Sequence, residues 1–166
     1  MYGNAVYADA RVNPDGTLDI SRWTRPQHDG APLRALTVRR WLRALGGEGA
    51  GVSALSVDVR AAAARLLRLD LALTRAHWRS PSLDIWEEEL GHHYFTLRVS
   101  AAALEEGAEW LRAGGEAAEA AALEQEARAI RTLLDGYWDE RGGYYRSRSL
   151  PGGARSAKEL DMAVIL

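Results

Sequence analysis

The sequence predicts an all-α protein, and three observations favour this fold class. Leucine and alanine recur every three or four residues through most of the chain after residue 30, which is typical of amphipathic helices. Glycine pairs end two of these apolar runs, at residues 46–47 and 114–115, where helices commonly stop. The 166 residues are 47% hydrophobic, so a packed core is expected, and we treat residues 1–166 as a single segment.

Four long helices are expected to follow a loop-rich start. Turn residues dominate the first 30 positions, which therefore predict loop. Residues 142–153 predict a hairpin or an extended loop, and a last helix is expected to begin near Ser156. Glu124 and Arg128 are spaced to form an ion pair on an outer helix face. With the last helix counted, the chain has four to five long antiparallel helices, the first four at residues 31–45, 57–78, 94–113 and 116–138.

The inward faces of these helices follow from the apolar spacing. Positions three or four apart lie on one side of a helix, so a stripe of such positions marks the side that is buried. The positions expected to face inward are Leu67, Leu71, Trp78, Leu97, Ala101, Leu104, Ala108, Leu111, Leu123, Ala127, Ile130, Leu134 and Tyr137.

Charge and composition exclude several classes of partner. The 21 basic and 23 acidic residues give a net charge of -2, which favours neither nucleic acid nor an anionic membrane. Cysteine is absent, and no apolar run approaches the roughly 18 residues of a membrane helix. The adjacent side chains of His92 and His93 do not converge, and no matching His or Cys spacing follows, so a metal site is not expected. These features leave the compartment undecided.

The last residues suggest a cut chain. An apolar run at residues 160–166 stops without a polar closing turn, and such a run normally continues into further structure. Uncovered helix faces are expected to cause self-association.

Residues 80–95 are the densest candidate site. Asp84, Glu87 and Glu88 lie beside Trp86, and a carboxyl group against an aromatic wall loses hydration and can stay protonated as a general acid. Tryptophan also stacks on sugar rings. In the alternative interpretation, Asp84 caps a short helix and Glu87 reaches back to its start, with Glu88 merely solvated.

A second cluster at residues 23–30 has groups suited to sugar hydroxyls. It contains the Trp23 indole, the Arg25 guanidinium and the Asp29 carboxylate just before the first helix. The alternative is an ordinary helix start, with Asp29 near the positive end of the helix dipole.

Together, the two clusters resemble signatures of the glucoamylases, glycoside hydrolase family 15. Residues 23–35 resemble the family pattern Trp-x-Arg-Pro-Gln-x-Asp-Gly-x-x-Leu-Arg-Ala. Residues 84–88 resemble its Asp-Leu-Trp-Glu-Glu block, followed at family spacing by Gly91 and by residues 94–96. Residues 147–161 resemble a weaker Lys-containing region, so the resemblance covers nearly the whole chain.

This resemblance implies an (α/α)6 toroid of six inner and six outer helices, incomplete here, with the active site in loops at one end. It implies inverting release of glucose from the non-reducing ends of α-1,4-glucans such as starch and maltodextrin, without a metal or organic cofactor. Glu87 matches the general acid. The residues expected to bind substrate are Trp23, Arg25, Asp84, Trp86 and Glu88.

Inversion needs a second carboxylate as base, roughly 6.5 to 9.5 Å from the acid. Glu88 and Glu89 are sequence neighbours of the acid and do not obviously reach the opposite face of the sugar, and the family's base lies in a later segment absent here. We therefore expect the 166-residue chain alone to be inactive or nearly so. Two alternatives stay open: a non-catalytic remnant or split-barrel subunit that binds glucan or assembles with another chain, and a toroid enzyme with a different bond preference.

Overall fold

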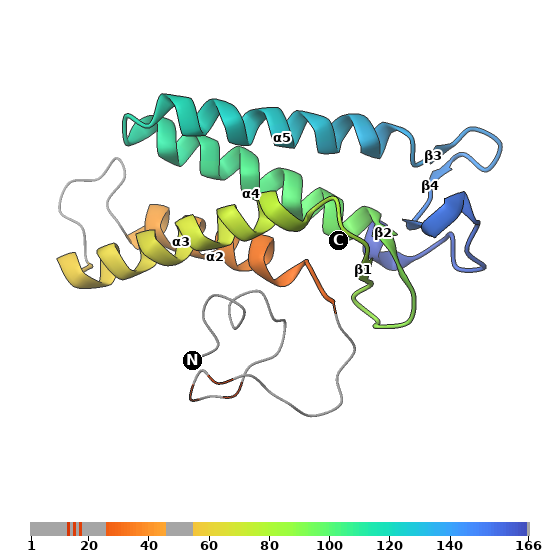
Figure 1. The fold of residues 1–166 in the computed structure, drawn as a ribbon, viewed down its shortest axis with the longest axis horizontal. Helices are drawn as coiled ribbons and strands as arrows, with labels where there is room; N and C mark the ends of the chain where they lie inside the picture. The colour runs from red at the N-terminus through yellow and green to blue at the C-terminus, as the bar shows by residue number, and fades with distance from the viewer. Residues whose placement is uncertain (1–12, 14, 16, 18–25, 46–54, 166) are drawn as a thin grey trace.

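The computed structural model describes residues 13, 15, 17, 26–45 and 55–165, which form long helices with short strands gathered at one end (Figure 1). The helices are α2 (Gly30–Leu45), α3 (Val57–His77), α4 (Tyr94–Ala113) and α5 (Ala117–Asp135). The strands are β1 (Ser82–Leu83), β2 (Leu90–His93), β3 (Trp138–Asp139), β4 (Tyr144–Tyr145) and β5 (Arg148–Ser149). Short 3-10 turns follow at Pro151–Gly153 (η1) and Met162–Val164 (η2). The four predicted helices are confirmed to within a few residues.

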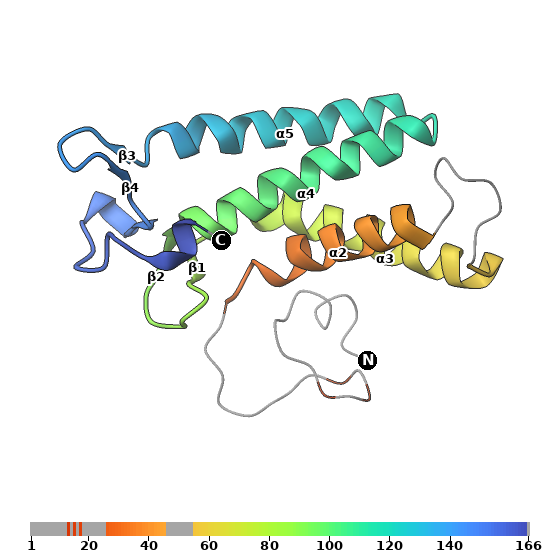
Figure 2. The ribbon, with the colours of Figure 1, turned by 180° about the vertical axis from the view of Figure 1, so that it is seen from behind.

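The core lies between the helices, where α4 and α5 run antiparallel beside the α2–α3 pair (Figure 2). Leu104 of α4 and Ile130 of α5 are both 0% exposed, and all thirteen positions predicted to face inward are buried. At Gly107, a Cβ atom would stand 2.4 Å from a methyl group of Leu71, so a residue without a side chain allows α3 and α4 to approach closely. The periodic stripes therefore predicted the core correctly.

A buried ion pair joins α2 to α3. Asp70 is 0% exposed, and its carboxylate accepts hydrogen bonds from Arg34, with Nε 3.0 Å from Oδ2. Burial raises the pKa of Asp70, and the Arg34 guanidinium opposes that rise. The pair fixes the start of α2, and hence the segment before it, against the middle of α3.

Two predictions about the later part of the chain are wrong. The helix expected to begin near Ser156 is not formed: residues 154–161 contain no helical turn before η2. The backbone of this segment forms a hydrogen bond to the residue before β5 instead: the Ser147 amide donates to the Glu159 carbonyl at 2.7 Å. Glu124 pairs with Arg112 across the α4–α5 turn, where Arg128 was expected. In both cases a partner distant in sequence replaces a local one.

The strands bring three loops together at the end opposite the α4–α5 turn (Figure 1). Strand β2 pairs with β1 on one side and with β5 on the other, and β3 pairs with β4. The hairpin expected as one of two alternatives within residues 142–153 is not formed, because β4 pairs with the earlier β3 and β5 pairs with β2. Tyr137 donates its hydroxyl to the His92 carbonyl at 2.9 Å, and burial raises the pKa of this phenol to about 12. In the described part of the chain, no helix has the length and apolarity needed to cross a bilayer.

Candidate active site

The loop between β1 and β2 carries the acidic cluster, and the Asp84 carboxylate organises it. Asp84 Oδ1 accepts from the backbone amides of Trp86 (3.1 Å) and Glu88 (2.9 Å), while the Glu87 amide donates to the Asp84 carbonyl at 2.9 Å. These bonds close a tight turn and no helix follows. The alternative prediction of a capped short helix is therefore wrong, although Asp84 does satisfy backbone amides as a cap would.

Glu87 occupies a strained position in this turn. Its φ of 61° lies in the left-handed region, which costs a residue with a side chain about 1 kcal/mol or more. The side chain is half-buried, and the neighbouring Trp86 is 54% exposed, so a broad aromatic surface stands beside the carboxyl group. Strain of this kind persists where surrounding contacts hold it, and it is frequent at functional sites.

Arg148, from β5, lies under the loop and holds it. Its side chain is 1% exposed, and its Nη1 atom donates to Asp84 Oδ2 (2.6 Å) and to Glu89 Oε2 (2.9 Å). Its Nη2 atom donates to Asp161 Oδ2 at 2.6 Å. One buried guanidinium thus joins three carboxylates: those of Asp84 and Glu89 at the two ends of the loop, and that of Asp161 further along the chain. Charge-assisted bonds of this kind are among the strongest in proteins.

The later segment, residues 147–163, also contacts the loop directly. The Trp86 indole Nε1 donates to both carboxylate oxygens of Asp161, each at 3.0 Å. The Ser156 hydroxyl donates to Glu89 at 2.6 Å, and Lys158 pairs with Glu88. This hydroxyl and Arg148 hold the pKa of Glu89 below its usual value.

Electrostatics at Asp161 follow the same contacts. Burial acts to raise its pKa, but the hydrogen bonds from the Ala163 amide and the Trp86 indole, together with Arg148, lower it overall. The group is therefore a carboxylate at neutral pH, and a charged acceptor fixes the Trp86 ring.

His93 supports the loop from behind. It is 4% exposed, and its Nε2 atom lies 2.9 Å from the Ser82 carbonyl oxygen and 3.0 Å from that of Glu89. Carbonyl oxygens only accept, so Nε2 carries the proton. Burial lowers the pKa of His93, which keeps the ring neutral near pH 7.

The segment before α2 reaches the same sheet. The Leu83 amide donates to the Pro26 carbonyl at 2.8 Å, and the His28 amide donates to the Ser82 hydroxyl at 3.0 Å. Asp29 directly precedes α2, as the helix-start interpretation expected; burial raises its pKa, and the negative charge of Glu87 adds to that rise. The two predicted clusters therefore meet. Trp23 and Arg25 lie outside the described residues.

The stability of this end of the molecule is expected to fall in mild acid. His28 stacks on His77 with ring centroids 5.0 Å apart, and burial, then the His77 charge, lowers the pKa of His28. The unfolded chain therefore binds this proton more readily, so stability is complete above the ordinary pKa of about 6.5 and is lost as the pH falls below it.

Urea unfolding from about pH 7.5 to about pH 5.5 measures this loss. His28→Gln is expected to reduce the pH dependence, and part of it is expected to remain because burial also lowers the pKa of His93. Equal pH dependence in the parent and in His28→Gln would contradict the assignment to His28.

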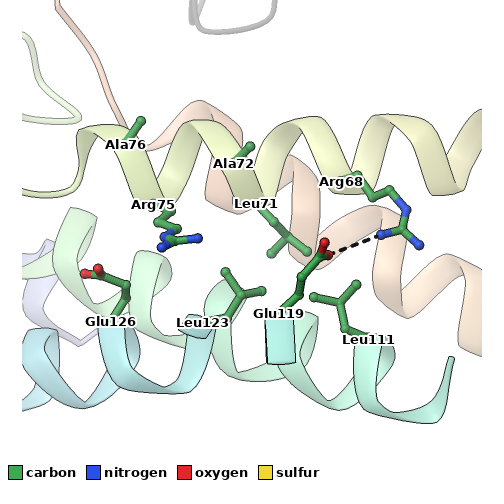
Figure 3. Close-up of a pocket in the computed structure, with 9 residues that line it drawn as sticks. All are labelled: Arg68, Leu71, Ala72, Arg75, Ala76, Leu111, Glu119, Leu123 and Glu126. Atoms are coloured by element: carbon green, nitrogen blue, oxygen red, sulfur yellow. Dashed lines mark ion pairs between the residues drawn. The ribbon is translucent and has the colours of Figure 1, made fainter. Parts of the chain in front are cut away.

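Two large hollows lie on helix flanks, away from Glu87. One of about 620 Å³ lies between α3 and the α4–α5 hairpin, where leucines meet charged side chains such as Arg75 and Glu126 (Figure 3). Another of about 700 Å³ is lined by Trp78, Leu133 and Tyr137. Within residues 26–45 and 55–165, no three acidic or histidine side chains are grouped to hold a metal ion.

The structure brings most of the predicted site together and adds residues that sequence reasoning missed. Asp84, Trp86, Glu87 and Glu88 share one turn, as their order predicts. No role was predicted for Arg148, Ser156 or Asp161, although residues 147–161 were noted as resembling a family region. That resemblance was the one signal that could have led to them.

The comparisons with known proteins agree with this architecture. Residues 11–166 match the model of the glycosyl hydrolases family 15, and the chain belongs to that family. A protein of Schizosaccharomyces pombe named "Probable glucoamylase" is 33% identical over 131 residues, which cover 79% of this chain and 28% of that protein.

Solved structures of the family contain the same arrangement of helices. The glucoamylase of Saccharomycopsis fibuligera matches 82% of this chain and 30% of its own, with a TM-score of 0.73 and 24% identity. The family 15 glucoamylase of Hypocrea jecorina matches 80% of this chain and 21% of its own, with a TM-score of 0.68 and 26% identity. The predicted fold class, part of an (α/α)6 toroid, is confirmed. The chain spans less than a third of each of these relatives.

Proposed function

We propose that this chain supplies the acid-bearing part of a glucoamylase, which releases glucose from the non-reducing ends of α-1,4-glucans. Glu87 is the proton donor to the glycosidic oxygen. The observation that carries the proposal is the position of Glu87: a strained, half-buried carboxyl group beside the exposed Trp86 ring, in a turn held by Asp84 and Arg148. General acids need both a fixed position and partial desolvation, and this turn supplies them.

The neighbouring residues take substrate-binding roles in this proposal. The Trp86 face stacks on a glucosyl ring, and Glu88 accepts hydrogen bonds from hydroxyl groups of the sugar beyond the cleaved bond. Asp84 contributes to the substrate site chiefly through the turn that it organises. Trp23 and Arg25, from the motif before α2, line the same cleft. The reaction uses no metal or organic cofactor.

Inversion requires a base on the opposite face of the sugar, roughly 6.5 to 9.5 Å from the acid. The carboxylates around Glu87 are engaged otherwise: Glu88 pairs with Lys158, and Glu89 and Asp161 both bind Arg148. The pKa of Glu89 and that of Asp161 are both lowered, so these two carboxylates are weak bases. We therefore place the base in a part of the barrel outside this chain and treat residues 1–166 as one segment of the catalytic domain.

Glucose release from maltose by the purified 166-residue chain tests this assignment. We expect no release above that of buffer, because an acid without its base leaves the attacking water unactivated. The matched control is the Glu87→Gln protein, which should give the same background. Sustained release by the chain that Glu87→Gln abolishes would overturn the placement of the base.

A second candidate is a non-catalytic subunit that assembles with another chain. It is favoured by the apolar hollows on the helix flanks and by exposed side chains such as Val59 and Leu133, each 43% exposed. Self-association through these faces stays a prediction. A subunit that touches no glucan would show no change at the Trp86 indole resonance when maltotriose is added.

A further inference from the structure

The side chains of Arg148 and Asp161 are largely buried, and together they contact the start of the turn, its end and the Trp86 ring. Arg148 is 1% exposed and binds Asp84 at the start of the turn and Glu89 at its end. Asp161 binds Arg148 and, through the same carboxylate, the indole of Trp86. The chain of contacts therefore runs from the buried guanidinium both to the backbone beside Glu87 and to the N–H edge of the Trp86 ring.

The two carboxylate oxygens of Asp84 accept hydrogen bonds from different partners in this network. Oδ2 is held by Arg148 at 2.6 Å, and Oδ1 accepts the amides of Trp86 and Glu88 on either side of Glu87. If the guanidinium were removed, Asp84 could rotate and both amides would lose their acceptor. The left-handed conformation of Glu87 depends on those bonds, because an isolated glutamate disfavours it.

We propose that Arg148 and Asp161 are positioning residues for the acid turn: Arg148 fixes the backbone around Glu87 through Asp84, and Asp161 fixes the plane of the Trp86 ring. The proposal rests on the proposed function for its catalytic meaning. Its geometric content stands on the contacts alone. A carboxylate bound to the indole N–H leaves the ring face as the surface that Trp86 offers to a sugar.

Amide exchange and indole spectra of the 166-residue chain separate positioning from general structural support. In Arg148→Gln, exchange of the Trp86 and Glu88 amides is expected to accelerate at least about tenfold, while amides of the α4–α5 core keep their protection. Arg148→Lys restores part of the charge and is expected to restore part of the protection. A purely structural role would instead weaken turn and core together.

Asp161→Asn tests the second half of the proposal. Replacing the charged acceptor by a neutral one is expected to shift the Trp86 indole N–H resonance, while the turn amides stay protected. The matched control is Arg155→Gln, which removes an exposed arginine from the same segment and should leave both readouts unchanged.

Unchanged exchange at Trp86 and Glu88 in Arg148→Gln would overturn the proposal. If Arg148→Gln weakens the core as well, its role is structural and the first half of the proposal is overturned. Asp161→Asn then decides the second half: an unmoved indole resonance overturns it, and a shifted one supports it. Neither readout depends on catalysis. A failure of Glu87 as an acid would therefore leave these results as they are, and the reverse also holds.

Discussion

Replacing Glu87 by glutamine is expected to lower kcat for maltotriose by about 10²- to 10⁴-fold in a completed barrel, because glutamine cannot give a proton to the leaving oxygen. The background for this measurement is a chimera in which residues 26–165 replace the aligned segment of a related glucoamylase, so that the base is present. KM is expected to change little, because proton transfer acts in the transition state.

Glu109→Gln in the same chimera is the matched control. Glu109, like Glu87, is a glutamate of this chain. It lies on the outer face of α4, 3.8 Å from Arg43, and its side chain is 63% exposed. Its loss should leave kcat unchanged. Equal rates for Glu87→Gln and the parent chimera would remove Glu87 as the acid.

Asp70→Ala is expected to destabilise the chain by about 3 kcal/mol, the lower end of what breaking a buried ion pair costs. The carboxylate is fully buried, whereas Arg34 keeps a 33% exposed side chain that can turn to water, which limits the loss. Urea unfolding followed by helical circular dichroism measures the change in the free energy of unfolding.

Glu109→Ala serves as the exposed counterpart in that measurement. Surface ion pairs contribute little, so a change within about 0.5 kcal/mol is expected. If Asp70→Ala were as harmless as Glu109→Ala, the Arg34–Asp70 pair would not be what holds α2 against α3.

The helices could be predicted because their information is local. Apolar positions such as Leu104 and Ile130 repeat with the helical period, and glycines mark where the runs stop, so bounds and buried faces both followed. The short strands could not be predicted as a sheet, since two-residue ladders have no periodicity to read. The prediction of a last helix was wrong because Ser156 and its neighbours form hydrogen bonds to groups far away in the sequence.

The site divides in the same way. Residues 84–88 form a continuous motif, so their common location was predictable, and the motif before α2 pointed to the same end of the molecule. Arg148 is one arginine among many, and its burial depends on carboxylates at Asp84, Glu89 and Asp161 that only the fold assembles. Residues proposed to act on the substrate are therefore easier to predict from the sequence than the residues that position them.

The sequence separation of these contacts sets an order of events as the chain is synthesised. Arg34 finds Asp70 across 36 residues, but Asp84 must wait for Arg148, 64 residues later, and Trp86 for Asp161, 75 residues later. Longer loops close at a greater entropic cost. The helices can therefore form and pack on a growing chain while the acid turn is still unrestrained, and Glu87 takes its place only after residue 161 has been made.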